Sequence, residues 1–194
     1  MPGTPEPDPV RAEGPPVVVH GVPGGRRVLV LDPAGASKHD ELPATWRPFT
    51  EDREIVWARL PVDGALHACE HVLAHAGGPL PVTDIVASGP YGEEALLLAE
   101  HRPSVVRSVL LVDPAAEGFL EAERARAADA DWLRDHGNRV AGLRDAGVEV
   151  EIVAHSTGDA GDRVPAPLPL GHPDVVSALV DAFDRLPAVR RPAL

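Results

Sequence analysis

The stretch that most limits how this chain can fold is residues 83–103. Apolar residues run into a tight Ser-Gly-Pro-Tyr-Gly turn at residues 88–92, and an Ala/Leu-rich run then ends at Pro103. This order predicts a buried strand, a sharp bend and a core helix. A second apolar run, residues 105–112, follows at once. The unit is therefore β-turn-α-β, and its two strands are expected to be parallel neighbours.

Strands and helices are expected to alternate along the rest of the chain as well. The sequence predicts further strands at residues 17–20, 27–32, 54–60 and 148–154, and helices at residues 65–76, 117–146 and 173–186, the middle one broken near Gly137. The first two of these strands are close in sequence, and we expect them to pair as a hairpin. Alternation of this kind predicts an α/β fold, a single-domain three-layer sandwich with a mostly parallel sheet.

The two ends of the chain differ in composition from this domain. Residues 1–16 are rich in proline and charged residues and poor in apolar ones, so a disordered tail is expected there. Residues 188–194 form a second, short tail. The predicted domain therefore spans residues 17–187.

Charge and composition exclude some classes of partner. The chain has 194 residues and a formal charge of -12, which disfavours nucleic acid and anionic lipid as partners. It has no apolar run long enough to span a membrane, and its one cysteine, Cys69, excludes an intramolecular disulfide. The expected location of this acidic protein is the cytoplasm. The sequence does not indicate its oligomeric state.

Three segments resemble the α/β-hydrolase superfamily. Residues 28–37 look like its strand and oxyanion loop, residues 84–103 like its strand, nucleophile elbow and following helix, and residues 107–114 like its next strand. The resemblance implies a hydrolase of ester, thioester or related acyl bonds with a nucleophile, a His base, an acid and two oxyanion donors. It places the oxyanion site and cleft around Ala34, Gly35, Gly89 and Tyr91. It implies no cofactor and no metal, and a lid that is reduced or absent.

The nucleophile position can be aligned in two registers. The family's elbow is Gly-x-Ser-x-Gly, in which small residues allow a sharp turn. When residues 84–103 are aligned without a gap, the nucleophile falls on Gly89, which has no hydroxyl, and Pro90 stands where the next N–H should donate to the oxyanion. A shift by one residue makes Ser88 the nucleophile, but it puts Val86 and Pro90 where small residues are needed.

The acid and the base are assigned from the same resemblance. Asp159, beyond the strand at residues 148–154, best matches the acid, with Asp162 and Asp113 in reserve. His172 matches the base. The alternative for this histidine is that His172-Pro173-Asp174 simply opens the last helix.

Two further patterns have simpler explanations. The run at residues 154–158, which contains His155 and Ser156, imitates the elbow, but no helix follows it, so a plain loop is favoured. His67, His71 and His75 are spaced by four residues and could offer two ligands to a metal, but a solvated helix face is favoured.

The functional hypotheses follow from these departures. Asp32 stands where the family has histidine, and a carboxylate there would repel an oxyanion unless it points away. Our first hypothesis is an α/β-hydrolase-like protein with weakened or lost serine-hydrolase chemistry that binds a small acyl or ester-type molecule. One alternative is an active carboxylester or thioester hydrolase that uses Ser88 with Asp159 and His172. The other is a non-catalytic protein-interaction module.

Overall fold

A computed structural model of the chain describes residues 13–37, 39–75, 83–118, 120–156 and 164–187. Its strands are β1 (Val17–Gly21), β2 (Arg26–Asp32), β3 (Arg53–Arg59), β4 (Thr83–Ser88), β5 (Val106–Val112) and β6 (Glu149–Ala154). Its helices are α1 (Ala65–Ala74), α2 (Gly92–His101), α3 (Ala122–Asp135), α4 (Gly137–Asp145) and α5 (Pro173–Arg185), with 3-10 helices η1 (Ala44–Glu51) and η2 (Gly89–Tyr91). The predicted strands and helices are confirmed, most of them to within two residues at each end.

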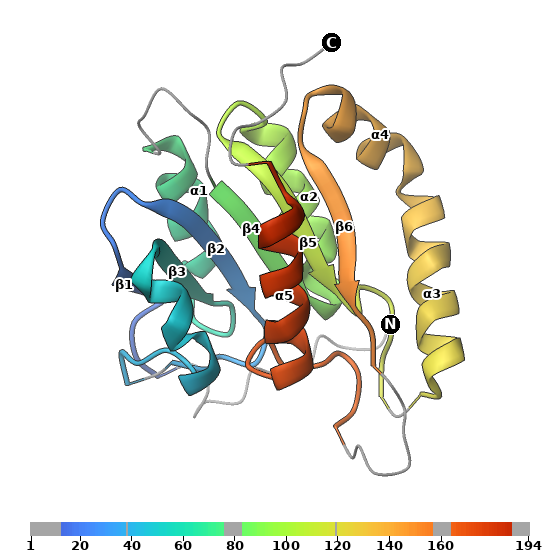
Figure 1. Cartoon of the computed structure of the whole chain (residues 1–194), viewed down its shortest axis with the longest axis horizontal. Helices are drawn as coiled ribbons and strands as arrows, with labels where there is room; N and C mark the ends of the chain where they lie inside the picture. Colours follow the sequence, from blue (N-terminus) through green and yellow to red (C-terminus); the bar gives the residue numbers. More distant parts are fainter. Residues whose placement is uncertain (1–12, 38, 76–82, 119, 157–163, 188–194) are drawn as a thin grey trace.

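The six strands form one mostly parallel sheet in the order β1-β3-β2-β4-β5-β6 (Figure 1). The central β4-turn-α2-β5 unit is formed as predicted, with β4 and β5 parallel neighbours. The predicted hairpin is wrong, because β1 pairs with β3 rather than with β2. The parallel crossover from β2 places β3 on the outer side of β2, and β1 then covers the open edge of β3 as the antiparallel strand.

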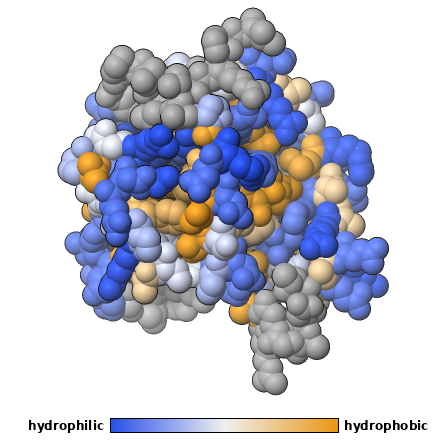
Figure 2. All heavy atoms as spheres, in the orientation of Figure 1, coloured by the Kyte–Doolittle hydropathy of each residue, from blue (hydrophilic) through white to orange (hydrophobic). Residues whose placement is uncertain are grey.

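Helices cover both faces of this sheet, so the chain is a single mixed α/β domain. One face packs against α1, α2 and α4 through an apolar cluster that includes Leu29, Ile85 and Leu96. The other packs against η1 and α5 through a cluster that includes Trp46 and Phe183. Helix α5 lies in front of the sheet in Figure 1, with α1 and α2 behind it. The space-filling view of the α5 side shows hydrophobic atoms between hydrophilic side chains (Figure 2).

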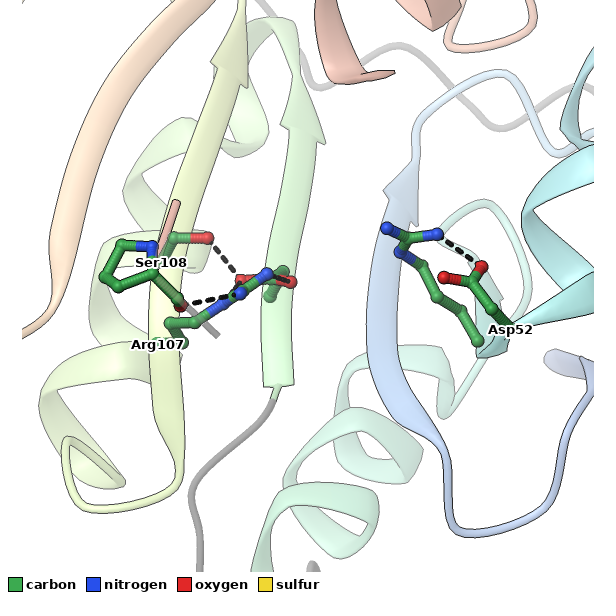
Figure 3. Close-up of polar contacts among 6 residues, drawn as sticks. Asp52, Arg107 and Ser108 are labelled. Atoms are coloured by element: carbon green, nitrogen blue, oxygen red, sulfur yellow. Dashed lines mark hydrogen bonds and ion pairs between the residues drawn. The ribbon is translucent and has the colours of Figure 1, made fainter. Parts of the chain in front are cut away.

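A buried ion pair lies near the amino ends of β4 and β5, and we call this side of the sheet its amino edge (Figure 3). Arg107 on β5 donates to both carboxylate oxygens of Asp84 on β4, and both side chains are at most 2% exposed. Ser108 donates to the same carboxylate at 2.6 Å, and Arg107 also donates to the carbonyl of Pro187 at 2.9 Å. These contacts join two parallel strands and the end of the last helix. Asp52 pairs with Arg53, the first residue of β3, in the same figure.

The start of the described chain is attached to the sheet. Arg59 donates from its backbone to the carbonyl of Pro16 and from its guanidinium to that of Pro15. The rest of the predicted disordered tail, residues 1–12, lies outside the described residues, as does the short tail at residues 188–194. Within the described ranges, no helix has the length and hydropathy needed to cross a bilayer.

Candidate functional site

The sharp turn after β4 is centred on Gly89. Ser88, the last residue of β4, has ordinary extended backbone angles, whereas Gly89 has a φ of +62°. That conformation favours glycine. A Cβ on Gly89 would also lie 2.7 Å from Cγ of Pro167. The apex of the turn therefore has no side chain, and the ring of Pro167 occupies the space above it.

The hydroxyl of Ser88 is directed to a structural partner. It donates to the carbonyl of Leu168 at 2.9 Å, and the residue is 1% exposed. The backbone N–H of the same Leu168 donates to Asp113 at the end of β5. The segment at residues 164–170 is thereby fixed across the carboxyl ends of β4 and β5. In the described part of the chain, Ser88 forms no hydrogen bond with a histidine.

The predicted oxyanion loop is organised by Asp32. This carboxylate accepts from the backbone N–H groups of Ala34 at 2.9 Å and Ala36 at 2.6 Å, and from the indole of Trp57 at 3.0 Å. Burial raises the pKa of Asp32, and these three hydrogen bonds and the charge of Arg59 act in the opposite direction. The N–H of Ala34, which an oxyanion would need, is therefore occupied by the carboxylate of the same loop. Gly35, at a φ of +67°, is buried and offers its carbonyl to Arg59.

The other predicted site residues are His172, Tyr91, Asp159 and the reserve acid Asp162. His172 is the N-cap of α5, and its Nδ1 accepts from the backbone N–H of Asp174 at 3.3 Å. It therefore opens the last helix. Tyr91 is half-buried at the end of the turn, and burial raises the pKa of its phenol. Asp159 and Asp162 lie outside the described residues, so the triad of Ser88, Asp159 and His172 stays a prediction.

A different polar cluster lies at the carboxyl ends of the strands, which is also where Ser88 ends β4. His155, just after β6, donates from Nδ1 to Oδ2 of Asp129 on α3 at 2.6 Å. Asp129 is 0% exposed and also accepts from the backbone N–H of Ala115. Asp113, also 0% exposed, accepts from the backbone N–H and the hydroxyl of Ser156 at 2.7 and 2.8 Å. Asp113, Asp129 and His155 each offer a donor atom within 4.8 Å of the others, and we call these three side chains the carboxyl-edge cluster.

Sequence reasoning did not predict this cluster, because it named Asp113 only as a reserve acid and assigned His155 to a plain loop. Asp113 and His155 directly follow β5 and β6, which are parallel neighbours, so both had to lie at the same edge. Asp129 is in the middle of α3, where the sequence gives no sign that it is buried. Its role depends on how α3 packs beside the sheet.

The predicted helix face of histidines is confirmed as exposed. His67 and His71 on α1 and His75 at its C-cap are all exposed, and the rings of His71 and His75 stack with their centroids 4.0 Å apart. A pocket of about 440 Å³ lies near the ends of α1 and α2, at the opposite edge of the sheet from Ser88. Its lining residues are Glu70, Leu73, Leu98, His101 and Arg102.

No family model matches this sequence, and neither does any curated protein.

Proposed function

We propose that this chain is an α/β-hydrolase-like protein that has lost serine-hydrolase chemistry and now acts by binding. The proposal rests on Gly89. The β4-turn-α2 unit of a mostly parallel sheet is the context in which a nucleophile elbow is formed. At its apex, the position of positive φ is a glycine with no nucleophile, and Pro167 lies where a side chain would extend.

Two neighbouring features support the same proposal. A serine nucleophile needs a base within hydrogen-bond reach, and the hydroxyl of Ser88 is instead donated to the carbonyl of Leu168. An oxyanion needs free backbone donors, and the N–H groups of Ala34 and Ala36 are bound to Asp32. Both groups thus serve the fold rather than an acyl substrate.

The test is labelling of the purified protein with a fluorophosphonate probe, beside a Ser88→Ala variant. We expect no labelling of the folded wild-type protein and no hydrolysis of p-nitrophenyl acetate above the rate of the variant. Circular dichroism of both proteins shows that they are folded. Labelling that disappears in Ser88→Ala would overturn the proposal and establish Ser88 as an activated nucleophile, as the alternative hydrolase requires.

The ligand class that the resemblance implies is a small acyl or ester-type molecule. Thermal unfolding with hexanoate and with its methyl ester measures this directly, because a ligand that binds only the folded state raises Tm. A concentration-dependent rise with either compound supports a small-molecule binder. The absence of any rise favours the protein-interaction module instead.

A further inference from the structure

We infer that the carboxyl-edge cluster of Asp113, Asp129 and His155 is a binding site for one divalent first-row transition metal ion, with Zn²⁺ as the best fit. The inference starts from charge. Two carboxylates that are both 0% exposed lie within 4.8 Å of each other. Buried charges are normally paired or bound to metal, because leaving water is costly for an ion.

The described residues supply fewer basic side chains than these two carboxylates need. Among the described residues, His155 is the one basic side chain that forms an ion pair with either of them. Two carboxylates together carry two negative charges, which is the charge that one divalent cation balances.

The donor set suits such an ion. One imidazole nitrogen and two carboxylate oxygens are ligand types that zinc accepts, and three protein ligands leave a position open for water or a small molecule. Zn–N and Zn–O bonds of about 2.0–2.2 Å hold neighbouring ligand atoms roughly 3.3 Å apart. The 2.6 Å contact between Asp129 and His155 therefore has to widen by roughly 0.7 Å when the metal replaces the shared proton.

The surroundings hold the ligands in place. Three donors from Ser156 and Leu168 fix the carboxylate of Asp113, and the N–H of Ala115 fixes that of Asp129. A carboxylate has about four acceptor sites, so each still has capacity for a metal. Outer hydrogen bonds of this kind orient ligands in metal sites. The side chain of His155 is 29% exposed, which gives the ion a way in from solvent.

The three ligands also come from separate elements. Asp113 follows β5, His155 follows β6, and Asp129 lies on α3 of the crossover that joins these two strands. One ion would therefore connect both ends and the middle of the β5-α3-α4-β6 unit. Binding should stabilise the folded chain, because the unfolded chain does not hold these residues together.

The test is isothermal titration of the EDTA-treated full chain with Zn²⁺, together with Tm measured across the same concentrations. We expect one equivalent to bind and Tm to rise. His155→Gln and Asp129→Asn should each lower the affinity by about 100-fold or more. Two variants are used because either alone could perturb the fold, and circular dichroism checks each one.

The matched control is a His71→Gln/His75→Gln double variant, which removes the stacked histidine pair on the exposed face of α1. We expect its affinity for Zn²⁺ to equal that of the wild type. The inference is overturned if the wild type shows no saturable binding, if both cluster variants bind as well as the wild type, or if the double variant loses the site. The fluorophosphonate result does not bear on this outcome, since the cluster shares no residue with Ser88 or Gly89.

Discussion

Asp84 at the amino edge of the sheet and Asp113 and Asp129 at the carboxyl edge are all buried, but they differ in what surrounds their charge. Asp84 has a full partner in Arg107, which is buried with it and donates to both of its oxygens. Among the described residues, the two carboxyl-edge aspartates have one basic partner, His155, which pairs with Asp129. The chain itself neutralises the buried carboxylate at the amino edge, which we call the closed edge. At the carboxyl edge, which we call the open edge, the described residues supply one histidine for two buried carboxylates.

The comparison suggests different roles for residues of the same type. At the amino edge, Arg107, Asp84 and Ser108 fix one arrangement of β4 and β5, and no external group is needed. At the carboxyl edge, ligands are bound in most open α/β sheets, because loops and strand ends meet there. An incompletely neutralised cluster at that edge therefore indicates a binding function more strongly than an ion pair at the other edge does.

The largest expected effect comes from removing Arg107, the partner of the buried Asp84 at the closed edge. Arg107→Met leaves Asp84 buried without its cation, and we expect a loss of about 3–5 kcal/mol in the free energy of unfolding. Urea denaturation measures it. Adding Asp84→Asn to this variant removes the unpaired charge and should recover part of the loss. A cost below about 1 kcal/mol for Arg107→Met would show that the pair does not close this edge.

The sequence predicted the parts of the molecule that depend on local pattern. The turn at Gly89, the strands on either side of α2 and the start of the last helix at Pro173 follow from apolar runs and from glycine and proline positions. The helix break at Gly137 was predicted in the same way and is confirmed.

Contacts between distant segments could not be predicted in this way. The pairing of β1 with β3 depends on which strand the β2 crossover brings to the edge. The position of Pro167 over Gly89 joins segments 78 residues apart, and the burial of Asp129 depends on the packing of α3. The position of positive φ at Gly89 rather than Ser88 needed the structure, because neighbouring residues at a turn look alike in sequence.

A smaller effect is expected when one charge is removed from the open edge. In EDTA-treated protein, Asp129→Asn should change the free energy of unfolding by no more than about 1 kcal/mol. The amide oxygen still accepts from Ala115, the amide group can donate to neutral His155, and one buried negative charge is gone. Urea denaturation beside Arg107→Met compares the two edges directly. A loss near 3 kcal/mol would mean that His155 neutralises Asp129 as fully as Arg107 neutralises Asp84, and the contrast between the edges would fail.

The smallest effect is expected for a second arginine–carboxylate ion pair. It has two hydrogen bonds, like the pair of Arg107 and Asp84, but it is more exposed to solvent. Arg139 donates to both oxygens of Glu100 at 2.8 and 2.9 Å, and the two side chains are 33% and 31% exposed. These hydrogen bonds lower the pKa of Glu100 from its ordinary value of 4.5. The stabilisation is therefore complete above about pH 4.5 and is lost as the pH falls through the lowered pKa.

We expect Glu100→Gln to cost about 0.5–1 kcal/mol at pH 7, and the difference from the wild type to shrink as the pH falls below 4.5. Urea denaturation at pH 7 and at several values below 4.5 measures both effects. Because water competes for both groups, the cost should be several-fold smaller than that of Arg107→Met, although each arginine binds its carboxylate through two hydrogen bonds. Equal costs for the two substitutions would mean that burial adds nothing to the closed edge, and that hydrogen-bond geometry alone sets the strength of both pairs.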